Sequence, residues 1–140
     1  MRLHQETPFH EGYQAITELN GKHSDMMMDF GILKLNEGTT FQDNAPLERV
    51  YVLLYGKIRV TYNGVEVIAS RKSFLDDDLW CLNMPLTGDV TIVGVAADSE
   101  VAVIRTENDR DFAPVVRCGN AIVNEIRGKG FMNEAGTRIV

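Results

Sequence analysis

The chain has 140 residues, of which 44% are hydrophobic and 24% charged, and its formal net charge is −6. This length and composition predict one globular domain with a sizeable core. The negative charge, with no cluster of lysines and arginines, excludes the basic face that a nucleic-acid-binding protein needs. No apolar run approaches the length of a membrane span, and no signal-like segment follows Met1, so we expect a cytoplasmic protein without a membrane partner.

The chain divides by its sequence character into three parts. Residues 1–25 are polar and irregular, which predicts an N-terminal arm without regular structure. Residues 26–108 contain short apolar segments separated by turn residues, and they are predicted to form the β core. Residues 109–140 are predicted to form C-terminal strands and a linker. Strands are expected over residues 26–35, 39–43, 49–55, 57–62, 65–69, 79–83, 90–96 and 101–106.

Short strands at this regular spacing predict an all-β, antiparallel sandwich or barrel. The three methionines at 26–28 are assigned to a strand packed on both sides, in preference to a ligand-binding cluster. The aspartates at 76–78 interrupt the strand pattern. We interpret them as a solvated turn in preference to a cation site.

Residues 48–64 give the strongest local signal. Gly56 predicts a tight turn between two strands, and Asn63-Gly64 predicts a second turn after them. An Asn-Gly pair favours a type I′ hairpin because both central residues must accept positive φ. The segment is therefore predicted to form the central hairpins of the fold.

This hairpin is similar to that of a cupin barrel, in which histidines and a glutamate converge on a divalent metal. By the usual cupin spacing, the four ligand positions fall on Asp43, Ala45, Arg49 and Thr91. Neither alanine nor arginine can donate to a metal. Glu48 is one residue out of register, and a slip of one residue turns a strand side chain to the other face. We therefore expect no metal in this chain.

The histidines and cysteines offer no clear replacement. His4, His10 and His23 precede the predicted barrel and match no short ligand spacing, although ligands folded back from the N-terminus stay an alternative. Cys81 and Cys118 fit neither a zinc site nor a redox pair, and we expect two free, buried thiols. The apolar sequence around Cys81 does not favour a reactive thiolate.

Candidate ligand-binding side chains lie on the same hairpin. Arg49 and Tyr51 share one face of its first strand, and Arg59 lies on a face of its second strand. Either arginine could bind the carboxylate of a sugar acid with two hydrogen bonds. The alternative is that these residues point outward, over a sheet packed against another subunit or lobe. We favour the outward alternative because charged residues rarely point unpaired into a small barrel.

Segments along almost the whole chain carry a resemblance to a known family. They are residues 30–38, 48–60, 71–74, 82–85, 100–103, 125–130 and 137–140. In this order and spacing they resemble the N-terminal lobe of the 5-deoxy-glucuronate isomerases of inositol breakdown, which are bicupins related to the 5-keto-4-deoxyuronate isomerases. The resemblance implies a cupin-type antiparallel β-barrel, also called a double-stranded β-helix or jelly roll.

The resemblance also implies that the metal ligands, and the divalent metal, belong to a second cupin lobe. We therefore expect a metal-free, structural and oligomerising lobe of an aldose–ketose isomerase acting on a sugar acid. Its partner would be that second lobe or an identical subunit in a homodimer, with Arg127 as a ligand-binding candidate near the partner. The alternatives are a stand-alone cupin that binds a small sugar or carboxylic acid as a sensor or carrier, and a single-lobe enzyme with an unrecognised metal site.

Overall fold

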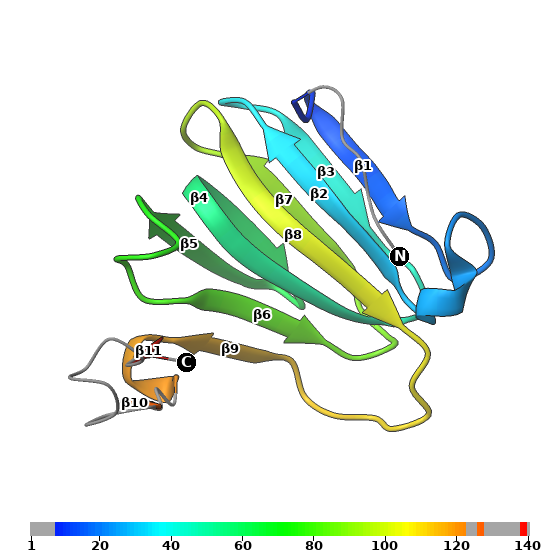
Figure 1. Ribbon diagram of the computed structural model, residues 1–140. Coiled ribbons are helices and arrows are strands. Elements are labelled where there is room, and N and C mark those ends of the chain that lie inside the picture. Colours follow the sequence, from blue (N-terminus) through cyan, green and yellow to red (C-terminus); the bar gives the residue numbers. More distant parts are fainter. Residues whose placement is uncertain (1–7, 123–125, 128–137, 140) are drawn as a thin grey trace.

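The fold consists of short strands that are paired antiparallel (Figure 1). The computed structural model describes residues 8–122, 126–127 and 138–139. Within these ranges two short 3-10 turns, η1 (Ser24–Met26) and η2 (Gly119–Ala121), interrupt an all-β chain. The strands are β1 (Gly12–Thr17), β2 (Asp29–Leu35), β3 (Thr40–Asp43), β4 (Glu48–Tyr62), β5 (Val65–Arg71), β6 (Trp80–Met84), β7 (Val90–Gly94), β8 (Ser99–Thr106), β9 (Val115–Cys118), β10 (Ile126–Arg127) and β11 (Arg138–Ile139).

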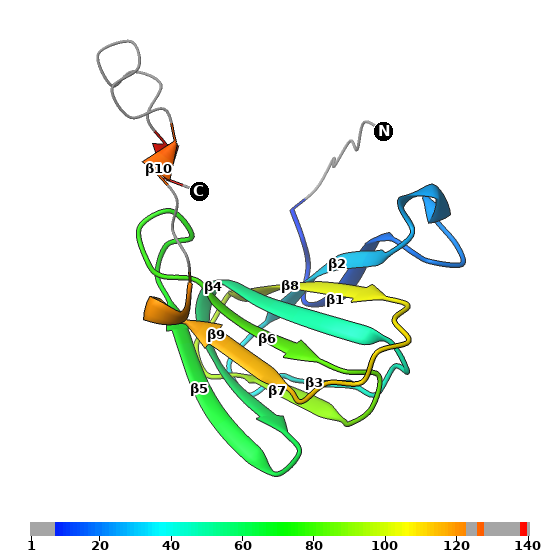
Figure 2. The same cartoon turned by 90° about the horizontal axis from the view of Figure 1, so that it is seen from below.

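The strands form two facing sheets that share β4. The first sheet has the order β1-β2-β8-β4-β6-β9, and the second has the order β3-β7-β4-β5. In Figure 2, β2 and β8 lie on one side of the fold and β3 and β7 on the other. Among the described strands the ladder of hydrogen bonds does not close on itself, so the predicted barrel is open at its edges.

The core lies between the two sheets. Its side chains come from the inward positions of both sheets, as the alternation of side chains along a strand requires. The apolar residues and the tyrosine with 0% exposure are Leu33, Tyr51, Leu53, Ile58, Val60, Leu82, Met84, Val90, Ile92, Val101 and Val103, and Arg49 and Ser99 are equally buried. The fully buried Arg49 is therefore part of a largely apolar interior.

Strand β4 passes from one sheet to the other at a β-bulge. Its pairing with β8 shifts register between Leu53 and Tyr55, and its later residues pair with β5 and β7. The inward side chains are odd-numbered before the bulge and even-numbered after it, for example Leu53 and Ile58. A bulge adds one residue to one strand, and this reverses the alternation.

The two turns predicted in this segment have different outcomes. A turn at Gly56 is wrong, because β4 runs through this residue, which has φ +100° at the bulge. The turn at Asn63-Gly64 is confirmed, and both residues have positive φ, 46° and 76°. This geometry matches the type I′ hairpin between β4 and β5.

Most other predicted strands are confirmed with small differences at their ends, but the N-terminal prediction needs correction. The irregular arm contains β1, which pairs with β2 and belongs to the first sheet. The prediction that the methionines form a strand is also wrong, because β2 begins only at Asp29. Met26 is the last residue of η1, and Met27 has a left-handed backbone conformation and is 77% exposed. The aspartates at 76–78 are exposed, as expected. The division of the chain at residues 26 and 108 stays a prediction.

No helix in the described part of the chain is long and apolar enough to cross a membrane.

We expect Gly56→Ala to destabilise the fold more than Gly38→Ala. Both residues have positive φ, but a Cβ at position 56 would collide with Ser99, whereas position 38 has open space. Gly56→Ala should therefore lower the free energy of unfolding by at least about 2 kcal/mol, and Gly38→Ala by about 1 kcal/mol. Urea unfolding measures both. Equal losses would show that the contact with Ser99 does not constrain the bulge.

Candidate functional site

A network of charged and polar groups joins the two sheets in the interior. Asp43, at the end of β3, accepts a hydrogen bond on Oδ2 from the Tyr51 hydroxyl at 2.9 Å. The same oxygen accepts from Nε of Arg105 at 2.8 Å and lies 2.8 Å from its Nη2. The backbone N–H of Ala45 donates to Oδ1 at 3.0 Å. The carboxylate of Asp43 is thus surrounded by donors, which is how a buried charge is made tolerable.

Arg49 occupies the interior next to this carboxylate. Its Nη1 donates to the carbonyl of Asp43 at 2.9 Å and lies 4.0 Å from Oδ1. Its Nη2 donates to the carbonyls of Pro85, Thr87 and Gly88, at 3.2, 3.3 and 2.6 Å. The guanidinium therefore fastens the loop between β6 and β7 to the inside of the fold. These contacts satisfy most of its donors without any ligand.

The favoured outward orientation is wrong for Arg49 and Tyr51, which are both fully buried, and correct for Arg59. Arg49 is fully buried, whereas Arg59 is exposed and forms an ion pair with Glu66 at 3.7 Å. The two arginines are both odd-numbered, but the bulge lies between them and turns them to opposite faces. The structure therefore brings Arg49 together with Tyr51 and separates both from Arg59. The side chain of Arg127, in β10, lies outside the described residues.

Burial and charge act together on the ionisable groups of the network. Burial, followed by the nearby Asp43 carboxylate, raises the pKa of Tyr51. Burial is also the main cause that raises the pKa of Tyr13. For Arg105 burial works to lower the pKa, but Asp43 outweighs it and the pKa is raised. Both tyrosines therefore stay neutral and Arg105 stays charged at neutral pH.

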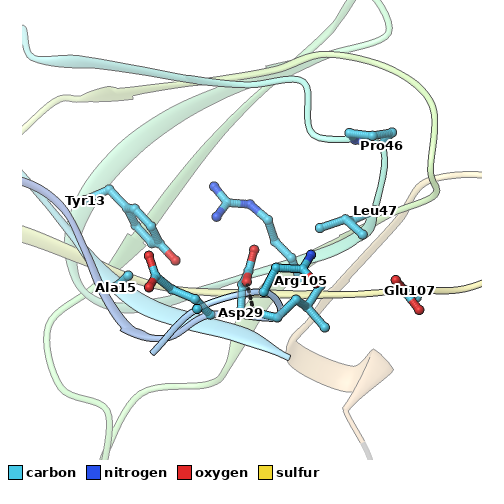
Figure 3. A pocket seen from close by; sticks show the side chains of 11 residues that line it. Tyr13, Ala15, Asp29, Pro46, Leu47, Arg105 and Glu107 are labelled. Atoms are coloured by element: carbon cyan, nitrogen blue, oxygen red, sulfur yellow. Dashed lines mark hydrogen bonds between the residues drawn. The ribbon is translucent and has the colours of Figure 1, made fainter. Parts of the chain in front are cut away.

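An open pocket of about 550 Å³ lies beside this network (Figure 3). Arg105 reaches it from β8 and lies over the ring of Tyr13, 4.9 Å from the ring centroid. The Tyr13 ring also packs against Phe41 at a centroid distance of 6.0 Å. The pocket is lined by Tyr13, Ala15, Glu18, Leu19, Asn20, Gly21, Asp29, Pro46, Leu47, Arg105 and Glu107.

The polar groups of this pocket favour hydroxyl groups over an acid. Arg105 directs Nε and Nη2 to Asp43, so its charge is already balanced. Glu18, Asp29 and Glu107 add three carboxylates to the lining. Such carboxylates accept hydrogen bonds from hydroxyls and repel anions. The Tyr13 hydroxyl is buried and has no hydrogen-bond partner within the described structure.

Sequence reasoning missed Arg105 and Tyr13. Arg105 continues the inward alternation of Val101 and Val103 along β8, and this pattern could have placed it in the interior. Tyr13 lies in a segment predicted to be irregular, and no sequence signal marked it. Asp43 was considered only as a metal-ligand position, not as the partner of two arginines.

The residues at the cupin ligand positions do not fit a metal. Asp43 is already surrounded by donors, and the Arg49 guanidinium lies where a cation would be repelled. Glu48 accepts hydrogen bonds from Asn83 and Asn108, at 3.2 and 2.6 Å. Among the residues that the structure describes, no group of three or more His, Cys, Asp or Glu could hold a metal ion. His4 lies outside this part of the chain.

The cysteines do not contribute an activated nucleophile to the described structure. Cys81 is half-buried in β6, and burial raises the pKa of its thiol. Both cysteines are free thiols, as predicted, but the predicted burial is wrong for Cys118, which is exposed in the last position of β9. A raised pKa keeps the Cys81 thiol protonated at neutral pH, which opposes nucleophilic chemistry.

Comparison with known proteins decides the family. The pattern of the KduI/IolB family matches residues 2–140. The chain belongs to the KduI/IolB family. This confirms the predicted resemblance to sugar-acid isomerases. Among the curated proteins that were compared, none matches this chain.

Solved structures confirm the cupin fold of this KduI/IolB family chain. An IolB-like protein from Salmonella typhimurium LT2 superimposes with a TM-score of 0.73 at 19% identity, over 87% of this chain and 47% of the other. A cupin superfamily protein from Desulfitobacterium hafniense DCB-2 gives a TM-score of 0.55 at 14% identity, over 76% and 95% of the two chains. The Schizosaccharomyces pombe Cnp3 cupin domain gives a TM-score of 0.53 at 11% identity, over 69% of this chain and 60% of the other. The chain thus spans about half the length of the IolB-like protein.

We expect Asp43→Asn to destabilise the protein by about 3–5 kcal/mol, because it leaves Arg49 and Arg105 buried without a balancing charge. The matched control is Glu66→Gln, which removes an exposed carboxylate paired with Arg59. The control should lower the free energy of unfolding by about 0.5 kcal/mol or less. Urea unfolding at neutral pH compares the two variants. A loss for Asp43→Asn as small as that of the control would refute the structural role of the network.

Proposed function

We propose that this chain is a metal-independent cupin lobe of a sugar-acid isomerase, in which it shapes and assembles the protein and does not catalyse isomerisation by itself. The observation that carries the proposal is the buried Arg49, which occupies a cupin ligand position and donates to four backbone carbonyls. A side chain held in this way organises the interior. It also leaves no place for a Lewis acid.

Electrostatics supports the same proposal. Two arginines and one aspartate make the interior network cationic, and a divalent ion there would be repelled. The free electron pairs of Asp43 already face Tyr51, Arg105 and Ala45. A metal would have to displace these donors and leave two buried guanidinium groups unbalanced.

The proposed assembly is with a second cupin lobe or with an identical subunit in a homodimer. Strand β5 pairs only with β4 in the described structure, so its other edge is open. Unpaired strand edges are ready to pair with another chain. Exposed apolar side chains on β5 and the segment after it support this contact, namely Val65, Ile68, Phe74 and Leu75.

The chemistry of the whole protein would then reside in the second lobe. That lobe would supply the divalent metal, which polarises the oxygens of the substrate while a base moves a proton between adjacent carbons. We propose inositol catabolism in the cytoplasm as the setting, in line with the IolB-like relative and with two free cysteines. Arg127 stays a proposed contact near the partner lobe.

The metal content of the purified 140-residue chain tests the proposal. After incubation with Mn²⁺, Fe²⁺ or Zn²⁺ and dialysis without chelator, elemental mass spectrometry should find metal far below stoichiometric amounts. Turnover of 5-deoxy-glucuronate should be absent in the same samples. Stoichiometric metal would contradict the proposal. If the triple variant His4→Ala, His10→Ala, His23→Ala then failed to bind metal, the metal would be assigned to the N-terminal histidines.

A second candidate function is a sensor or carrier that binds a small sugar or carboxylic acid. The pocket beside Tyr13 and Arg105 favours this candidate, since it combines an aromatic ring, one guanidinium and several carboxylates in a concave site. This set of groups suits the hydroxyls of a sugar better than a free carboxylate.

Amide chemical shifts of the isolated chain test this candidate. On this hypothesis glucose and glucuronate should both shift the amides of Tyr13, Asp29 and Leu47, with glucose the tighter ligand because the pocket carboxylates repel the acid. Glu107→Gln removes one of the repelling carboxylates, so it should reduce the difference in affinity between glucose and glucuronate. No shift with either sugar would exclude the pocket as a sugar site and leave the structural proposal unaffected.

A further inference from the structure

A second pocket, of about 520 Å³, lies at the point where β4 crosses between the sheets. It is separate from the Tyr13–Arg105 pocket and shares no residue with it. Gly56 and Lys57, just after the bulge, pair with Arg71 and Ser70 near the end of β5. The lining consists of Tyr55, Gly56, Lys57, Ser70, Arg71, Lys72, Asp77 and Ala96.

The lining of this pocket is cationic although the chain carries a net charge of −6. Lys57, Arg71 and Lys72 contribute three positive charges against the single carboxylate of Asp77. Lys57 and Lys72 are exposed, and neither forms an ion pair within the described residues. Two exposed lysines at one concave site attract an anion, although the charge of Lys72 also acts on the Asp77 carboxylate and helps to lower its pKa.

Arg71 places a buried charge beneath the two lysines. It is only 7% exposed, and it donates to the carbonyls of Leu53, Phe74 and Asp77 at 2.9, 3.0 and 3.3 Å. Its Nε is buried and has no partner in the described structure. Carbonyl dipoles hold this guanidinium, and Asp77 is the one carboxylate of the pocket on which its charge acts. A buried charge is screened less by water than an exposed one, so its attraction reaches into the pocket.

The one carboxylate of the pocket is occupied by the backbone. Asp77 accepts hydrogen bonds from the N–H groups of Lys72 and Ser73, at 2.5 and 3.2 Å. These bonds are the main cause that lowers the pKa of Asp77. The carboxylate holds the turn after β5 in shape, which fixes the position of the Lys72 backbone at the pocket.

We propose that this pocket binds a small phosphate-bearing anion. Lysine ammonium groups act as point charges that suit the compact charge of a phosphate. Tyr55 and Ser70 also line the pocket, and a hydroxyl is a group that can donate to phosphate oxygens. The pocket beside Arg105 carries three carboxylates and should not bind the same ligand. The inference is independent of the proposed function.

Titration of the full chain with inorganic phosphate and with pyrophosphate, followed by amide chemical shifts, tests the proposal. The amides of Gly56, Lys57 and Ala96 should shift, and those of Tyr13 and Asp29 should not. Sodium chloride at matched ionic strength is the control for salt. Pyrophosphate should bind more tightly than phosphate, and added salt should weaken both because exposed charges are screened.

Charge variants make the test specific to the pocket. The double variant Lys57→Gln, Lys72→Gln should weaken pyrophosphate binding by about tenfold or more. Lys22→Gln removes an exposed lysine that adjoins the Tyr13–Arg105 pocket and does not line the cationic pocket, so it should leave binding unchanged. The amide spectrum of each variant confirms that it is folded. Absent shifts at Gly56 and Lys57, or equal weakening by Lys22→Gln, would overturn the proposal and indicate non-specific attraction only.

Discussion

The structure depends on the bulge in β4 more than on any other feature. This strand belongs to both sheets, and it can serve both only because one extra residue near Gly56 reverses the alternation of its side chains. The reversal keeps Arg49 and Tyr51 inside the fold and turns Arg59 to the solvent. It also leaves a hollow at the crossing point. Core, interior network and second pocket all follow from this local change of register.

At the cupin ligand positions of this chain, hydrogen bonds and ion pairs hold the interior together. Where donors to a divalent ion would converge, Arg49 bonds to backbone carbonyls, and Asp43 bonds to Tyr51 and Arg105. Buried ion pairs often contribute little net stability, since desolvation offsets their attraction. Their effect here is geometric, because they hold a loop and strands of both sheets in one arrangement.

The sequence predicted the fold well where local signals act alone. The Asn63-Gly64 turn and the strands predicted over residues 90–96 and 101–106 depend mainly on local sequence, and the structure confirms them with small differences at the strand ends. The turn predicted at Gly56 is wrong because glycine with positive φ is suited to both a turn and a bulge, and only the pairing with β8 distinguishes them. Strand β1 is not predicted from the sequence because its pairing with β2, and not its own residue pattern, defines it.

The candidate site was less predictable for a related reason. Alternation placed Arg49 and Tyr51 on one face, but it could not say whether that face was the inner one. The general rule that charged residues stay outside then gave the wrong orientation for Arg49. The exception depends on Asp43, which is close in sequence but belongs to another strand, and on Arg105, which is far away in sequence and joins the network only in the folded chain.

The mutual dependence of Asp43, Arg49 and Arg105 also restricts how this sequence can evolve. Replacing Asp43 leaves two guanidinium groups without their balancing charge, and replacing Arg49 leaves the carbonyls of Pro85, Thr87 and Gly88 without their donor. A single step at either position towards a metal-binding interior therefore passes through a less stable protein. Several replacements would have to occur together before histidine or glutamate at these positions brought any benefit. The network thus opposes a stepwise change of this interior into a metal site, because the intermediate sequences would be less stable.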